Sequence, residues 1–243
     1  MRSPHFGCSV LTTAYFPPVE YFFAIAHSDR VLIEQHEAYQ KQSWRNRCRI
    51  LSAAGPEDLS IPVVKEERLS RPIRDIRIDY GEPWLQHHVR ALAAAYNHSA
   101  FYDYYADDLI PILERKPAFL FDLNQSLLEK LLSLLGIDVP ISLTDTYLPA
   151  PLRSDIPLPS QEMPRTLRVP NALQGDIDFF DGRSRIQPKY KGESLLAEYG
   201  CEQAYYQVFI NQDPSRGESF IPNLSILDLL SAEGPDAGAF LRI

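Results

Sequence analysis

The first 34 residues alternate between two hydrophobic patterns, and this alternation restricts what the chain can fold into more than any other feature. Residues 8–16 are rich in β-branched and aromatic side chains and end at Pro17-Pro18, as a buried strand does. Residues 19–27 have helical spacing, and residues 30–34 return to a strand pattern. Two strands separated by a helix with short connections are typical of a parallel βαβ unit. We therefore expect an α/β fold in which a βαβ unit opens a mixed sheet flanked by helices.

The remaining chain predicts further strands and helices. Strands are expected at residues 43–50, 58–64, 73–80 and 205–210. Helices are expected from Trp84 through an apolar stripe that ends at Tyr96, and at residues 103–115, 119–135 and 223–230. Pro111 is expected to bend the second of these helices, Gly136 to end the third, and Asn223 to cap the last.

Residues 137–170 contain seven prolines and show little periodicity. A stretch of this length without regular elements in a compact protein is usually functional or disordered. It predicts either a cover over a cleft or a plain surface excursion, in a single domain that spans residues 1–243.

The charge balance excludes a dedicated nucleic-acid binder. The formal net charge is -8 and the pI is near 5.3, whereas a phosphate backbone requires a broad basic surface. Cys8, Cys48 and Cys201 are too few and too widely spaced for a disulfide framework or a repeated metal motif, which favours a reducing compartment. No run of about 18 apolar residues predicts a membrane span. We therefore expect a cytoplasmic protein.

Residues 39–50 concentrate positive charge against this acidic background. Four cations, Lys41, Arg45, Arg47 and Arg49, fall within nine positions. Alternate side chains of an extended strand share a face, so the three arginines are expected to point the same way. Guanidinium forks bind phosphate or carboxylate oxygens bidentately. The pattern predicts a site for a small anionic substrate; the alternative is a solvent-facing strand whose arginines pair with acidic residues.

Other side chains are candidates for the same site. Lys189, together with Lys191, forms a second basic spot that is expected to complete the anion pocket. Tyr15 and Trp44 are expected to supply apolar walls. Cys48 lies between two arginines, but strand alternation turns it to the opposite face, which predicts a small buried hydrophobe rather than a nucleophile.

Glu34 and His36 are the candidate catalytic residues. They lie two positions apart, so on a strand they share a face, and a carboxylate can orient an imidazole as a general base. At the end of a second parallel strand, the two residues would lie where open α/β sheets bind ligands. The alternative is a chance pairing without a catalytic role.

Four segments together resemble the WbqC-like family of bacterial proteins. They are residues 14–22 (AYFPPVEYF), residues 39–50 (YQKQSWRNRCRI), Trp84 with residues 96–101, and residues 222–230 (PNLSILDLL). The resemblance implies a link to surface polysaccharide (O-antigen) gene clusters and the transfer of glycine or another acyl group onto a sugar. The chain departs from the family pattern at Gln35-His36 and at residues 175–182, which favours a branch with another substrate.

We therefore expect a transferase that acts on a nucleotide sugar, an acyl donor or another carboxylate-bearing substrate. The alternative is a non-catalytic binding or assembly protein of a glycan-synthesis complex. An acid or base beside the arginines in one pocket would favour the enzyme, whereas arginines held in internal salt bridges on a flat face would favour the alternative. The sequence identifies no cofactor and no metal ligands, and it leaves the oligomeric state open.

Overall fold

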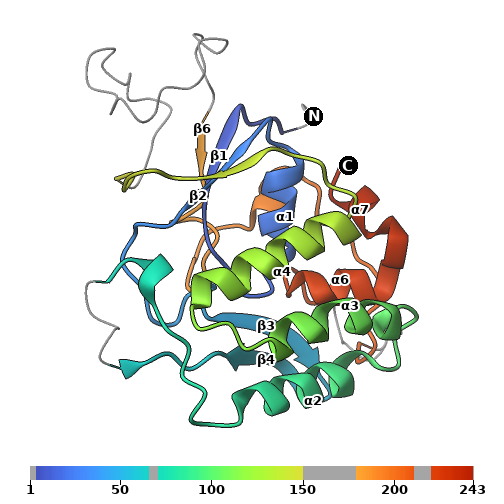
Figure 1. The fold of residues 1–243 in the computed structure, drawn as a ribbon. Coiled ribbons are helices and arrows are strands. Elements are labelled where there is room, and N and C mark those ends of the chain that lie inside the picture. Colours follow the sequence, from blue (N-terminus) through green and yellow to red (C-terminus); the bar gives the residue numbers. More distant parts are fainter. Residues whose placement is uncertain (1–3, 66–70, 150–178, 211–219, 243) are drawn as a thin grey trace.

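A parallel sheet forms the centre of the computed structural model, which describes residues 4–65, 71–149, 179–210 and 220–242. The four strands lie in the order β5-β2-β1-β6 (Figure 1). They are β1 (Cys8–Thr12), β2 (Val31–Glu34), β5 (Ile141–Leu143) and β6 (Phe179–Asp181). β1 and β2 pair in parallel, with Ser9 opposite Val31 and Thr12 opposite Glu34, and α1 (Val19–Ala26) connects them. The α/β class and its βαβ opening are confirmed.

An antiparallel hairpin lies beyond the carboxyl ends of these strands (Figure 1). It pairs β3 (Arg47–Ser52) with β4 (Gly55–Ser60) as a separate two-stranded sheet. The expected strand at residues 43–50 begins at Arg47. Residues 44 and 45 form a turn in which Trp44 bonds to the loop after β1, while Asn46 makes a bond in register with the β3–β4 pairing. The Trp44 carbonyl accepts from the Tyr15 amide at 2.8 Å, and the Asn46 carbonyl accepts from the Ile61 amide at 2.7 Å. The prediction that Arg45 shares a strand face with the other two arginines is wrong.

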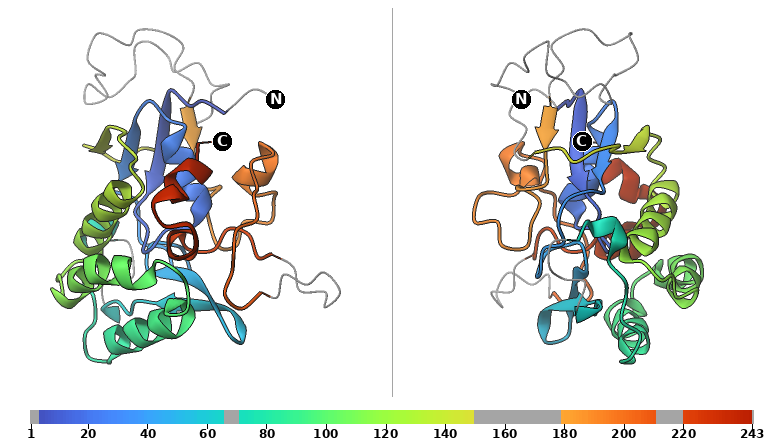
Figure 2. Two further views of the ribbon diagram at one scale, coloured as in Figure 1. Left: turned by 90° about the vertical axis from the view of Figure 1, so that its right-hand side faces the viewer. Right: turned by 60° about the vertical axis from the view of Figure 1, so that its left-hand side comes forward.

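The predicted helices are present, and helical layers surround the sheet and the hairpin (Figure 2). The larger ones after α1 are α2 (Trp84–Tyr96), α3 (Tyr102–Glu114), α4 (Leu120–Leu134) and α6 (Ile226–Glu233). The shorter ones are η2 (Ile73–Asp75), α5 (Leu195–Glu198), η6 (Gly234–Asp236) and α7 (Ala237–Phe240). α3 packs against α2, α4 and α6, while α1 packs against α5 and α6. The leucine stripe of α4 is buried, and Gly136 follows it at φ +61°, a conformation that suits glycine at a helix end.

Two of the expected strands are absent. Residues 73–80 begin with η2, and Ile78 and Arg77 then make single bridges to Val63 and Phe119. Residues 205–210 have no strand pairing, and side chains fix this segment: Gln207 exchanges hydrogen bonds with the backbone of Ile221 at 2.9 and 3.0 Å. Residues 76–79 alternate apolar and charged residues because Ile76 and Ile78 are buried, which imitates a strand pattern without a ladder. Residues 205–210 are rich in β-branched and aromatic side chains, but the buried member of this segment is the polar Gln207.

The proline-rich stretch is more regular at its start than its sequence predicts. Residues 141–143 form β5, which extends the sheet beside β2. The Val31 amide donates to the Pro140 carbonyl at 2.9 Å, and the Thr144 amide donates to the Ile33 carbonyl at 3.1 Å. Residues 150–170 lie outside the described residues.

The late helix begins three residues after the expected position. Ser225 caps α6, since its hydroxyl accepts from the Leu227 amide at 3.3 Å. Asn223 instead caps α1: its side-chain oxygen accepts from the Glu20 amide at 3.1 Å. Pro18 precedes α1 and has no side-chain oxygen for this purpose, so the cap comes from a distant part of the chain.

The core contains the apolar face of α6, in agreement with its expected role. Ile226, Leu229 and Leu230 are fully buried. Within the described ranges, no helix combines the length and the apolar composition required to cross a bilayer.

Candidate functional site

The carboxyl ends of the parallel strands carry the main group of buried polar side chains outside the helices. Thr12, Glu34 and Asp181 are the last residues of β1, β2 and β6. The chain leaves β1 toward β2, while β6 lies on the opposite side of β1. In open α/β sheets, this change of direction creates the crevice in which ligands bind. The edge next to β1 is therefore the candidate site.

Glu34 is fully buried and holds several backbone groups at this edge. One carboxylate oxygen accepts from the His36 amide at 2.6 Å and from the Thr144 hydroxyl at 3.0 Å. The other accepts from the Leu148 amide at 2.7 Å and lies 3.7 Å from a guanidinium nitrogen of Arg183. The carboxylate therefore fixes the segments that follow β2 and β5.

Arg183 is a site residue that the sequence analysis missed. Its guanidinium binds both carboxylate oxygens of Asp181, at 2.9 and 2.7 Å, and donates to the Leu148 carbonyl at 2.5 Å. Burial by itself lowers the pKa of Arg183. The hydrogen bond and charge of Asp181, followed by the charges of Glu37 and Glu34, together outweigh burial, so the pKa of Arg183 is raised above its usual value. The group stays protonated and cannot act as a base.

Gly182 makes this placement of Arg183 possible. Its amide donates to the Val10 carbonyl at 3.0 Å, and a Cβ atom at this position would lie 2.5 Å from Cδ2 of Leu11. The backbone therefore passes close to β1, and the next residue turns over the carboxyl edge. The triplet Asp-Gly-Arg directly after an aromatic strand is the signal that could have identified this residue.

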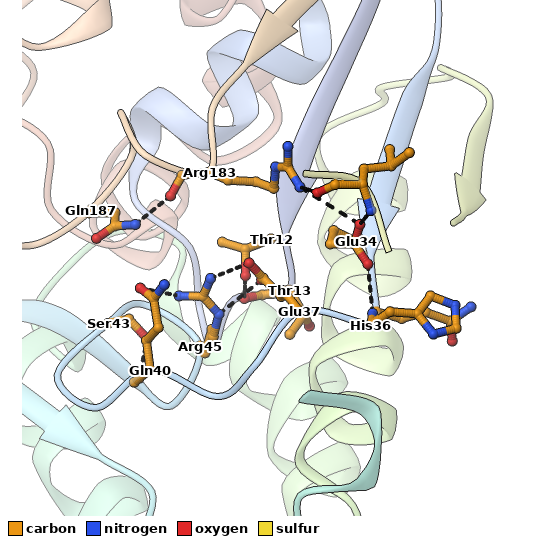
Figure 3. Close-up of polar contacts among 12 residues, drawn as sticks. Thr12, Thr13, Glu34, His36, Glu37, Gln40, Ser43, Arg45, Arg183 and Gln187 are labelled. Atoms are coloured by element: carbon orange, nitrogen blue, oxygen red, sulfur yellow. Dashed lines mark hydrogen bonds and ion pairs between the residues drawn. The ribbon is translucent and has the colours of Figure 1, made fainter. Parts of the chain in front are cut away.

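A second buried ion pair lies at the same edge, between Arg45 and Glu37 (Figure 3). The guanidinium contacts the carboxylate through Nε at 2.9 Å and Nη2 at 2.6 Å. The Arg45 carbonyl accepts from the Asn124 amide group of α4 at 2.8 Å, which ties the turn to the helical layer. Only 1% of the Arg45 side chain is exposed. Bidentate geometry of this kind fixes the orientation of both partners.

Thr12 and Thr13 lie between these two groups of charges in Figure 3. Both are buried, and the Thr13 hydroxyl has no hydrogen-bond partner among the described residues. A buried hydroxyl without a partner is costly unless water or a ligand satisfies it. Thr13 is 1% exposed, so this hydroxyl lies inside the protein and not on the surface of the edge.

Two exposed lysines, Lys41 and Lys189, lie close to the segment that carries Arg45. The Lys189 ammonium contacts the side-chain oxygen of Gln42, whose chain neighbour is Lys41. Neither lysine has a carboxylate partner among the described residues. The structure therefore brings Lys189 next to the cation-rich segment, although the two are separated by 147 positions.

Arg47 and Arg49 occupy a different place, on the outer face of the hairpin. Both bind Asp58 of β4: Arg47 at 3.1 Å, and Arg49 through two nitrogens at 2.7 and 3.2 Å. Arg49 also lies over the Trp44 ring, 5.7 Å from the centroid. Two guanidinium groups thus share one carboxylate, and Arg45 is not part of this group.

Tyr15 and Trp44 are core residues in the structure. They are 0% and 5% exposed. The Tyr15 hydroxyl bonds to Nδ1 of His88 at 3.0 Å, and burial, with a smaller contribution from the charge of His87, lowers the pKa of His88 to about 4. These rings stabilise the loop after β1 and present no open face for a ligand to stack on.

His36 does not contact the Glu34 carboxylate through its ring. Its Nε2 lies 3.0 Å from the Thr144 carbonyl, which can only accept, so Nε2 is the donor in this hydrogen bond. Glu34 binds the His36 amide instead. The carboxylate fixes the backbone on which the imidazole is mounted.

The described residues contain neither a reactive thiol at this edge nor a metal cluster. Burial, with a smaller contribution from the charge of Asp58, raises the pKa of Cys48 far above its usual range, so the side chain is an inert thiol. No group of three His, Cys, Asp or Glu side chains in the described ranges is placed to hold a metal ion.

Comparison with known proteins places this architecture in a family. The WbqC-like protein family matches residues 13–240. The chain belongs to this family. The matched region of this WbqC-like protein begins directly after β1 and includes Glu34, Glu37, Arg45, Arg183 and Lys189.

A curated relative has the same extent. The chain is 30% identical over 238 residues to "Uncharacterized protein Rv1507c" of Mycobacterium tuberculosis (strain ATCC 25618 / H37Rv), and the match covers 96% of this chain and 96% of the relative. No solved structure matches the chain significantly.

Proposed function

We propose that this WbqC-like protein is a transferase of bacterial surface polysaccharide synthesis, and that it binds the phosphate or carboxylate of an activated donor at the carboxyl edge of its parallel sheet. The supporting observation is the contact between Lys189 and Gln42, because it joins two cation-bearing segments over that edge. Membership of the family supports the biological context through the resemblance described above.

Lys41 and Lys189 are the proposed contacts for the anion. An ammonium group without a carboxylate partner attracts an anion more strongly than a guanidinium that is already neutralised in an ion pair. Arg45 is paired with Glu37, so its proposed role is to keep the loop that carries Lys41 in place.

His36 is the proposed general base. Its proton on Nε2 is held by the Thr144 carbonyl, so Nδ1 can accept a proton from the hydroxyl or amino group of an acceptor. Glu34 is a positioning residue, because it fixes the His36 backbone and the Thr144 hydroxyl. A His36→Asn variant should retain donor binding and lose turnover, whereas equal loss of both would exclude the role of base.

Thermal-shift measurements with pyrophosphate and small carboxylates test the anion site. Stabilisation of the wild-type protein should disappear in the double variant Lys41→Gln/Lys189→Gln, because both unpaired ammonium groups are removed. It should persist in Arg47→Gln/Arg49→Gln, the matched double variant on the hairpin. Loss of stabilisation only in the hairpin variant would move the anion site to Arg47 and Arg49, which together have one carboxylate partner. Stabilisation that neither double variant changes would contradict the proposal.

A non-catalytic binding or assembly protein is the second candidate, and one observation favours it. The guanidinium groups of Arg45, Arg47, Arg49 and Arg183 all have carboxylate partners inside the chain. Arrays of this kind are also built for structure alone. Incubation with donors and sugar acceptors distinguishes the two, since a binding protein retains its ligand and releases no product.

A further inference from the structure

Tyr190 is an exposed aromatic ring beside the proposed anion contacts. Its side chain is 43% exposed, and it directly follows Lys189. The Tyr190 amide donates to the Gln187 carbonyl at 3.0 Å, and the Gln187 side chain donates to the Arg183 carbonyl. These hydrogen bonds connect the backbone of Tyr190, through Gln187, to Arg183 at the carboxyl edge.

The ring is supported by its neighbours. The Arg185 guanidinium lies 5.2 Å from the ring centroid. Arg185 is itself held by the Glu198 carboxylate and, at 3.2 Å, by the Glu193 carbonyl. Gly192 lies against the phenol edge so closely that a Cβ atom there would collide with the ring. An exposed aromatic ring with a fixed position is suited to stacking.

We propose that Tyr190 stacks on the base of a nucleoside diphosphate whose phosphates bind at Lys189 and Lys41. This inference rests on the proposed anion site and names the chemistry of its ligand. Planar bases stack on aromatic side chains, and ammonium groups bind phosphate oxygens. The two contacts come from adjacent residues, so one ligand can reach both.

Tyr190 takes the role that the buried rings cannot perform. Tyr15 and Trp44 are closed to solvent, whereas Tyr190 is open and lies on the segment that contacts Gln42. Nucleotide sugars and coenzyme A thioesters both contain a nucleoside diphosphate. Comparison of the affinities for UDP, ADP and coenzyme A therefore distinguishes a sugar donor from an acyl donor.

Titration calorimetry on the full chain tests this assignment with UDP, ADP, coenzyme A and pyrophosphate. At least one nucleotide should bind about tenfold more tightly than pyrophosphate, the size expected for one stacked base. Tyr190→Ala should abolish that advantage and leave pyrophosphate affinity unchanged, while Tyr190→Phe should retain it. Gly192→Ala should reduce it by displacing the ring. Tyr104→Ala is the matched control, because Tyr104 is a 69% exposed tyrosine on α3.

The outcomes separate this inference from the proposed function. Preference for UDP supports a sugar donor, and preference for ADP and coenzyme A supports an acyl donor. Equal affinity for all nucleotides and pyrophosphate, with binding still dependent on Lys41 and Lys189, would overturn the stacking role and leave the anion site intact. A nucleotide advantage that persists in Tyr190→Ala would also overturn it. Absence of any binding that depends on the two lysines would overturn both proposals.

Discussion

Arg45 and the pair Arg47 and Arg49 lie within five positions of one another, yet they occupy opposite environments. The Arg45 side chain is 1% exposed and faces Glu37, which is 10% exposed. Arg47 and Arg49 are 21% and 38% exposed and share Asp58, which is 27% exposed. The arginines of one segment therefore have different roles, because the exposure of each side chain determines how much its ion pair contributes to stability.

Removal of one partner from the buried pair should have the largest effect. Arg45→Leu leaves the Glu37 carboxylate buried without its bidentate partner, and such changes cost about 3–5 kcal/mol. Chemical denaturation should show this loss. The double variant Arg45→Leu/Glu37→Leu is the control and should recover a large part of it, because no isolated charge remains. A loss below about 1 kcal/mol in the single variant would mean that the pair behaves like a surface contact.

The buried Tyr15–His88 hydrogen bond is a third case, because His88 makes the stability of the core depend on pH. Burial lowers the pKa of His88 from 6.5 to about 4, so between these values the unfolded chain binds more protons than the folded protein. Stability is therefore lost as pH falls through this window, by about 3 kcal/mol at pH 4. His88→Gln should remove this pH dependence. The measurement is the unfolding free energy of wild type and variant at pH 7 and at pH 4, and wild type should lose more stability than the variant between the two.

Asp228 provides the control of opposite sign. Burial raises its pKa from 3.8 to about 6, against hydrogen bonds from Gln207, Tyr205 and Tyr96. The stability that protonated Asp228 contributes is fully present below pH 3.8, and it is lost as pH rises through about 6. Asp228→Asn should therefore show an opposite trend to His88→Gln, and the same sign in both variants would contradict the assignment of either group.

The smallest effect is expected on the hairpin. Asp58→Ala releases Arg47 and Arg49, which remain hydrated, so the loss should be about 1 kcal/mol or less and should shrink with added salt. Melting curves at low and high ionic strength measure it. A loss comparable to that of Arg45→Leu would show that exposure does not distinguish the two regions.

The sequence predicted the elements in which a hydrophobic period decides the structure. The βαβ opening and the leucine stripe of α4 bury apolar faces with regular spacing, and both were located within a few residues. The strand predicted at residues 73–80 is absent. Alternation of apolar and charged residues shows only that one side of a segment is buried, and a segment held by single bridges buries one side as a paired strand does.

The candidate site was predicted less completely than the fold. Of the cation-rich segment, Arg45 lies at the carboxyl edge in an ion pair with Glu37, and Lys189 contacts Gln42 of the same segment. Whether this segment binds an anion stays a prediction. The division between Arg45 and its neighbours depends on where β3 begins, after a turn at residues 44 and 45 in which Trp44 bonds to the loop after β1. Arg183 depends on a glycine that allows close passage over β1. The Asp-Gly-Arg triplet marks this glycine, but the sequence does not show that it approaches Leu11 of β1.

The start of α6 is bound to the loop that follows β1. The Ser225 hydroxyl donates to the Phe16 carbonyl at 3.0 Å, and the Asn223 side chain caps α1, contacts that span 209 and 203 positions. During synthesis, the ribosome therefore finishes β1 long before it makes the residues that fasten the next turn. Until then, α1 of the nascent chain lacks its Asn223 cap, and its apolar residues are exposed, as chaperone-binding segments are. Contacts over such separations form late, so the protein completes its fold only when most of the chain has been made.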